Sequence, residues 1–91
     1  MNLTISNYNN FFKMKGILDR NTLHVFHDEF RDIFKKVNSV TISIEDVVSI
    51  DRYGVNAIVE LHNQALINNK KFAIIGLGCK DLYDHFQSEA A

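Results

Sequence analysis

The six residues Ser49-Ile50-Asp51-Arg52-Tyr53-Gly54 contain the most chemically specific side chains of the chain. They stand where an apolar run gives way to a helical pattern. An aspartate at the start of a helix accepts hydrogen bonds from free backbone N–H groups, and Arg and Tyr are enriched at binding hot spots. Arg52 is either a solvated charge or the partner of a carboxylate on another protein. Tyr53 either contacts that protein or packs its ring over the sheet edge.

A histidine pair is the second group of side chains that could do chemistry. His24 and His27, with Asp28, are spaced so that the two imidazoles fall on neighbouring positions of one helix. Zinc requires more ligands than these, and the sequence positions no second pair to supply them. We therefore interpret both as solvated helix histidines and predict no metal site. His62 falls on the apolar side of a later helix, in the core or at an interface.

The single cysteine, Cys79, follows Gly76-Leu77-Gly78. A thiolate at a helix start is reactive, but a catalytic cysteine also needs a base and an oxyanion site, and neither is identifiable. The two glycines lack the third glycine of a dinucleotide fingerprint and the Gly-Lys-Ser/Thr of a P-loop. We predict a non-enzymatic protein without a cofactor. An enzyme or ligand-binding domain is the competing class, supported by the histidine pair and Cys79.

The elements that must position these residues begin with a hairpin. Leu3–Ser6 and Phe12–Gly16 alternate apolar and polar residues, and the turn-rich residues 7–10 separate them. Residues 16–20 then form a connection to a helix of about four turns, in which apolar residues recur at steps of three and four from Leu23 to Val37. Asn21 or Thr22 is its expected cap.

The second half of the chain alternates strands and helices. Residues 40–45 alternate strictly, and the apolar residues of 47–50 extend the strand toward the centre of a covered sheet. A helix follows from about Tyr53 to Asn68, which Asn68-Asn69 ends because Asn tolerates the left-handed conformation. Its apolar face is wider than packing on one sheet requires, and the excess belongs either to the core or to an interface, including that of a homodimer. Residues 72–76 form another buried strand, and a short last helix follows Gly78.

This order of elements, β-β-α-β-α-β-α, predicts one domain over residues 1–91. Strand–helix–strand units of this length form right-handed crossovers with parallel pairing, and the first hairpin adds an antiparallel strand. The expected fold is α/β, a mixed, mostly parallel sheet of four to five strands with helices packed mainly on one face.

With this order, the segment Ile50-Asp51-Arg52-Tyr53-Gly54-Val55 resembles the STAS domain family, which contains anti-sigma-factor antagonists and the C-terminal domains of sulfate transporters. The turn Asn69-Lys70-Lys71, followed by an apolar strand and Gly76, is a second match. The resemblance covers nearly the whole chain and implies a STAS-like fold. It also implies a partner-binding site at the helix entrance, carried over here to Asp51, Arg52, Tyr53, Gly54, Val55 and Asn56.

The chain departs from the family at the positions between the aspartate and the glycine. Family members that switch by phosphorylation carry Ser or Thr there, and a kinase that is itself an anti-sigma factor adds roughly −1.5 to −2 charges to that hydroxyl. Here the positions hold Arg52 and Tyr53. Tyr53 is a candidate phosphorylation site, although its phenol reaches further than a Ser hydroxyl. The resemblance therefore implies a docking site rather than the usual switch.

Charge and composition exclude several other classes of function. The formal net charge is −1, from ten basic and eleven acidic residues, which argues against nucleic-acid binding because that needs a basic face. It also disfavours electrostatic membrane attachment, and the apolar runs are too short for insertion into a bilayer. The N-terminus lacks the features of a signal peptide, and one cysteine forms no internal disulfide. These observations predict a cytoplasmic protein.

The sequence thus predicts a stand-alone bacterial STAS protein that regulates through binding. In one form it is an anti-sigma-factor antagonist that sequesters a kinase-like or regulatory protein. The alternative is an accessory subunit that binds the ATPase of an ABC transporter of the lipid-trafficking type. The missing Ser or Thr weakens the phosphorylation-switched form of the first role and leaves constitutive binding open.

Overall fold

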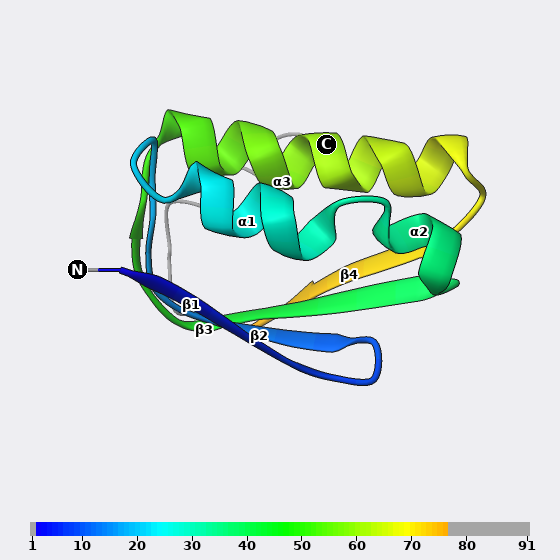
Figure 1. Cartoon of the computed structure of the whole chain (residues 1–91), viewed down its shortest axis with the longest axis horizontal. Coiled ribbons are helices and arrows are strands. Elements are labelled where there is room, and N and C mark those ends of the chain that lie inside the picture. The colour runs from blue at the N-terminus through cyan, green and yellow to red at the C-terminus, as the bar shows by residue number, and fades with distance from the viewer. Residues whose placement is uncertain (1, 77–91) are drawn as a thin grey trace.

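The computed structural model describes residues 2–76, which form a four-stranded sheet and three helices (Figure 1). In chain order the elements are β1 (Leu3–Tyr8), β2 (Phe11–Leu18), α1 (Leu23–Phe30), α2 (Ile33–Lys36), β3 (Ser39–Ile50), α3 (Arg52–Ile67) and β4 (Lys71–Ile75). The strands lie in the order β1-β2-β3-β4. The β1–β2 pair is antiparallel, and β2–β3 and β3–β4 are parallel. The predicted α/β fold with a mixed, mostly parallel sheet is confirmed. The last helix predicted after Gly78 lies outside the described residues.

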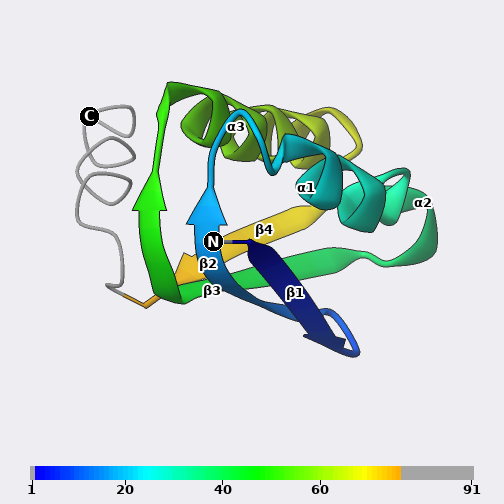
Figure 2. The ribbon, with the colours of Figure 1, turned by 60° about the vertical axis from the view of Figure 1, so that its left-hand side comes forward.

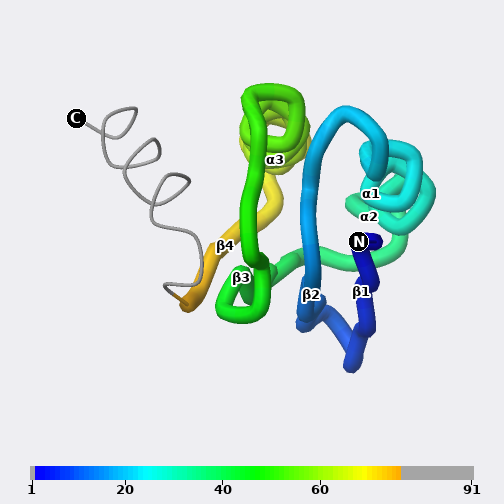
Figure 3. The backbone as a smooth tube through the Cα atoms, turned by 90° about the vertical axis from the view of Figure 1, so that its left-hand side faces the viewer, coloured from blue at the N-terminus to red at the C-terminus, as the bar shows by residue number. Residues whose placement is uncertain are grey.

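The three helices cover one face of the sheet, so the described part of the chain has two layers (Figures 2 and 3). α1 contacts β1 and α3, and α3 also contacts β3 and β4. Between the layers, the rings of Phe12, Phe26 and Phe30 meet with centroids 4.7 to 4.8 Å apart. No helix within residues 2–76 has the length and apolar character needed to cross a membrane. The side chains of the core are Leu3, Phe12, Met14, Leu18, Phe26, Phe30, Ile33, Phe34, Val40, Ile42, Ile44, Val47, Val55, Ala57, Ile58, Leu61 and Ala65.

β2 continues beyond the predicted end of the strand, so the expectation that residues 16–20 are all connection was wrong for 16–18. Gly16 stays paired with Leu3 and Val47 because it adopts φ 110°, a conformation open to glycine, and a Cβ there would lie 2.0 Å from the Asn2 carbonyl oxygen. Beside it the register shifts by one residue, which leaves Val48 of β3 unpaired with β2 and exposed.

The predicted four-turn helix is two helices, because the backbone leaves the helical conformation at Arg31 and Asp32. Arg31 is extended, and Asp32 is left-handed with φ 55°. The apolar stripe continues across the break, since Phe30 and Ile33 are both buried. Thr22 occupies the N-cap position without capping: its hydroxyl donates to the Ile17 carbonyl (2.9 Å) and accepts from the Asp19 N–H (2.9 Å).

α3 has the predicted bounds to within one residue, and β4 is less buried than predicted. Asn68 donates its side-chain amide to the Gln64 carbonyl (2.7 Å), and Asn69 is left-handed with φ 59°, which ends the helix as expected. In β4, Phe72 and Ile74 are half-buried and the alternate residues are exposed, because within the described residues helices cover only one face of the sheet and β4 has a strand on only one side.

The left-handed backbone at Asp32 predicts that a substitution by glycine stabilises the fold. Asp32→Gly should raise the free energy of unfolding by up to about 1 kcal/mol, because glycine occupies this region without a Cβ clash. Glu60→Gly, at an exposed position inside α3, should lower it by about 0.5 kcal/mol. Urea denaturation measures both. Equal losses in the two variants would contradict the left-handed break between α1 and α2.

Candidate functional site

The predicted site lies at the carboxyl ends of two neighbouring parallel strands. β2 leads into residues 19–22 and then α1, and β3 leads through Asp51 into α3 (Figure 2). The Asp51 N–H donates to the Leu18 carbonyl (3.2 Å), which holds the two connections side by side. Loops at this edge of a parallel sheet are the usual place for binding residues.

The Asp51 carboxylate joins the two connections with one hydrogen bond to each. One oxygen accepts from the Gly54 N–H (2.9 Å) and so caps α3, as predicted. The other accepts from the Arg20 N–H (3.0 Å) in the turn after β2. A single side chain therefore fixes both the start of α3 and the position of the backbone at Arg20.

These hydrogen bonds change the acidity of the Asp51 carboxyl group. Partial burial alone would raise its pKa, but the N–H donors of Gly54 and Arg20, with smaller contributions from Tyr53 and Asp51 itself, outweigh burial and lower the pKa below the ordinary value of 3.8. Asp51 is therefore a carboxylate at neutral pH. Its negative charge also favours the positive end of the α3 dipole.

Gly54 is the point of closest approach between α3 and β2. A Cβ at Gly54 would lie 2.6 Å from the Leu18 carbonyl oxygen, and the Ile50 and Leu18 side chains would be 2.7 and 2.8 Å away. A backbone carbonyl in a paired strand moves little, so position 54 has no room for a side chain. The glycine of the motif is needed for packing.

Arg20 and Tyr53 form the exposed contact of the site. The Arg20 guanidinium carbon lies 5.9 Å from the centre of the Tyr53 ring, within the range of a cation–π interaction. Tyr53 remains 46% exposed, and Arg52 beside it is exposed. The side chains of Arg20, Arg52 and Tyr53 are thus exposed to solvent, and the hydrogen bonds of Asp51 fix the backbone that carries them.

The structure divides the six predicted site residues into two groups. Gly54 and Val55 are buried in the core, and Asp51 is engaged in backbone hydrogen bonds. Arg52, Tyr53 and Asn56 are exposed. We call Arg20, Arg52, Tyr53 and Asn56 the helix-entrance surface. Sequence reasoning missed Arg20 because it lies 31 residues before Asp51. Its position directly after a strand parallel to β3 was the signal that could have located it.

The three histidines within residues 2–76 do not gather at one site, since two lie on α1 and one lies on α3. His24 and His27 are exposed on α1, and Asp28 pairs with Arg31 (3.0 Å). Residues 2–76 contain no cluster of three or more His, Cys, Asp or Glu side chains that could hold a metal ion. His62 stacks on Phe72 with ring centroids 5.6 Å apart. Cys79 and Gly78 lie outside the described residues.

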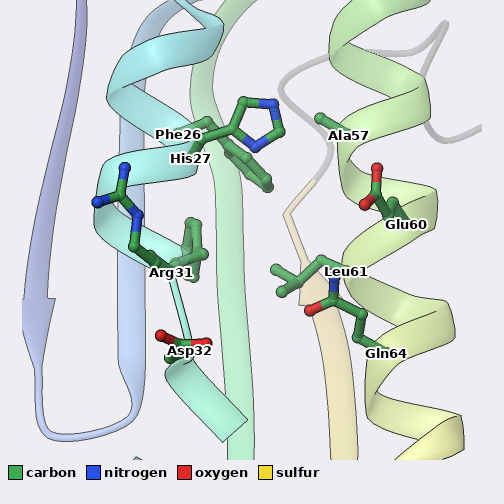
Figure 4. Close-up of a pocket in the computed structure, with 9 residues that line it drawn as sticks. Phe26, His27, Arg31, Asp32, Ala57, Glu60, Leu61 and Gln64 are labelled. Atoms are coloured by element: carbon green, nitrogen blue, oxygen red, sulfur yellow. The ribbon is translucent and has the colours of Figure 1, made fainter.

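A groove of about 260 Å³ lies between α1 and α3 (Figure 4). Phe26, Phe30 and Leu61 form its floor and are almost completely buried. Its rim is polar, with His27 and Arg31 on the α1 side and Glu60 and Gln64 on the α3 side. Arg31 is paired with Asp28, and the rim also carries the carboxylates of Asp32 and Glu60.

Comparison with known proteins adds information on the fold. No family model matches the chain, and no curated protein matches it. Among solved structures, the crystal structure of Mglu is similar, with a TM-score of 0.62 and 14% sequence identity over 78% of this chain. The chain spans 18% of the length of that protein. At this identity the likeness shows the fold alone.

The close approach at Gly54 predicts an inverted response to alanine. Replacing glycine by alanine inside a helix normally stabilises by about 1 kcal/mol. Gly54→Ala should instead lower the free energy of unfolding by about 1–3 kcal/mol, because the added methyl meets the Leu18 carbonyl. Asn56→Ala, exposed on the same helix, is the control and should raise the free energy of unfolding by about 0.5 kcal/mol, because alanine is the better helix former. A Gly54→Ala protein more stable than the wild type would contradict the packing.

The lowered pKa of Asp51 predicts a pH dependence of stability. A carboxyl group whose pKa is lower in the folded than in the unfolded protein stabilises the folded state. This contribution is complete at pH values above the unfolded-state pKa, and it is lost as the pH falls through the folded-state pKa. The stability difference between wild type and Asp51→Asn should therefore be largest near neutral pH and shrink below pH 3.8. Denaturation curves over this range measure it. A difference independent of pH would contradict the ionised cap.

Proposed function

We propose that this chain is a STAS-like, non-enzymatic interaction module that binds a kinase-like or regulatory protein in the manner of an anti-sigma-factor antagonist. The observation that carries the proposal is the helix-entrance surface: Arg52 and Tyr53 face solvent on a turn that Asp51 fixes by hydrogen bonds of 2.9 and 3.0 Å. A rigid surface loses little conformational entropy on binding, and Arg and Tyr are typical of binding hot spots.

The residues of the helix-entrance surface also support a proposal on how binding is regulated. No Ser or Thr stands between Asp51 and Gly54, so the binding we propose is constitutive on the side of this chain. Control then lies in the partner, or in phosphorylation of Tyr53, whose ring is partly exposed beside Arg20. A phosphate there would add negative charge next to two guanidinium groups. The role we propose is cytoplasmic, which the single cysteine supports.

A second candidate role rests on the missing hydroxyl. An accessory subunit that binds the ATPase of an ABC transporter needs no phosphorylation switch, so the Arg52-Tyr53 pair suits it as well. Affinity capture from native cells followed by mass spectrometry separates the two roles. Recovery of a kinase-fold or regulatory protein supports the antagonist role. Recovery of transporter ATPase subunits alone would overturn it in favour of the second.

The helix-entrance surface predicts the effect of reversing one charge. Arg52→Glu should weaken binding to the captured partner by more than about 1 kcal/mol, because a hot-spot cation is replaced by an anion. Lys15→Glu, the same charge change at an exposed residue of β2, should leave the affinity nearly unchanged. Titration calorimetry measures both variants after circular dichroism has shown that they are folded. Unchanged affinity of Arg52→Glu would remove Arg52 from the site.

A further inference from the structure

The end of the sheet opposite the helix-entrance surface is built from three chain connections. They are the β1–β2 turn at 9–10, the α2–β3 connection at 37–38 and the α3–β4 connection at 68–70 (Figure 1). Hydrogen bonds hold them together at the start of β3. Asn38 accepts from the Lys71 N–H (3.1 Å) and from the Lys70 ammonium (2.8 Å). Asn10 accepts from the Thr41 N–H (3.0 Å) and donates to the Ser39 hydroxyl.

Positively charged residues are concentrated at this end. Lys35 and Lys36 close α2, and Lys70 and Lys71 lead into β4. The longer stretches of chain that contain these three connections, residues 2–18, 33–44 and 61–76, have no Asp or Glu. The nearest acidic residue in sequence is Asp32, which lies 3.8 Å from Lys35 in a solvent-exposed pair of little strength. The net charge of −1 therefore conceals a basic end on the described part of the chain.

Two aliphatic side chains protrude beside the lysines. Leu66 and Ile67, in the last turn of α3, are 65% and 81% exposed. They are the two most exposed large aliphatic residues within 2–76, and Lys70 and Lys71 follow them closely. We call Lys35, Lys36, Leu66, Ile67, Lys70 and Lys71 the lysine end. A single exposed apolar residue is normal on a protein surface. Here two such residues are adjacent to each other and lie next to lysines.

We propose that the lysine end binds the surface of an anionic phospholipid membrane. Basic residues attract the negative surface potential of such a membrane, and neighbouring aliphatic side chains bury themselves at the headgroup boundary. The protein adsorbs in this way without inserting a helix. The net charge of the chain argued against electrostatic attachment to a membrane. The proposal differs from that expectation because adsorption depends on where the charges lie, which the net charge does not show.

Residue type favours a lipid surface over an acidic protein. All four cations are lysines, which act as hydrated point charges, whereas recognition of carboxylates in fixed geometry typically uses the planar fork of arginine. The charges also stand at one end of the molecule, on α2 and on the connection between α3 and β4, which lie near each other (Figure 1). The helix-entrance surface differs, because its two cations, Arg20 and Arg52, are arginines.

Vesicle flotation tests the proposal with the full chain. It should bind vesicles of phosphatidylcholine containing phosphatidylserine and should not bind phosphatidylcholine alone. Each lysine near an anionic surface contributes about fivefold to binding, so Lys36→Gln/Lys71→Gln should weaken it about 25-fold at low salt. The control Lys13→Gln/Lys15→Gln loses the same charge at exposed residues of β2 outside the lysine end, and should change binding less than about twofold.

A third variant separates the apolar contribution. Leu66→Ser/Ile67→Ser should weaken binding at both low and high salt, whereas the effect of the lysine variant should largely disappear at high salt. Circular dichroism checks that each variant is folded. Absence of binding to phosphatidylserine vesicles, or equal losses in the lysine variant and its control, would overturn the proposal. Binding to polyglutamate without binding to these vesicles would overturn it in favour of an acidic protein partner.

Discussion

The arrangement of the helix-entrance surface depends on the carboxylate of Asp51. It accepts one hydrogen bond from the first turn of α3 and one from the turn after β2, so two connections far apart in sequence share a single anchor point. Gly54 allows this arrangement, because α3 lies so close to the Leu18 carbonyl that no side chain fits between them. The exposed positions of Arg20, Arg52 and Tyr53 follow from these two contacts.

Much of the fold could be predicted because its signals are local. The alternation of residues 40–45, the aspartate before α3 and the asparagines after it each determine a nearby backbone conformation, and these predictions are confirmed. The break at Asp32 could not be found in this way, since the apolar stripe runs through it. Gly16 was taken for the end of a strand, because its pairing with Leu3 and Val47 is a tertiary property.

The placement of the candidate site was predictable for the residues of its motif and not for the residue that a second connection contributes. Asp51, Arg52 and Tyr53 lie where the sequence placed them, but Val55 belongs to the core and Arg20 enters from another connection. Neighbours across parallel strands are set by topology and register, which the local pattern does not contain. The lysine end was hidden for a similar reason, since a sum of charges over the chain carries no information on their positions.

The parallel strands place different chemistry at their two ends: arginines and a tyrosine on a backbone fixed by Asp51, and lysines with protruding aliphatic residues at the opposite end (Figure 1). We propose that the partner binds the first of these. Amide hydrogen exchange of the chain, alone and with the captured partner, locates the binding surface. Binding there should slow exchange in the turn 19–22 and in the first turns of α3. Slower exchange confined to other segments, with these two unchanged, would contradict it.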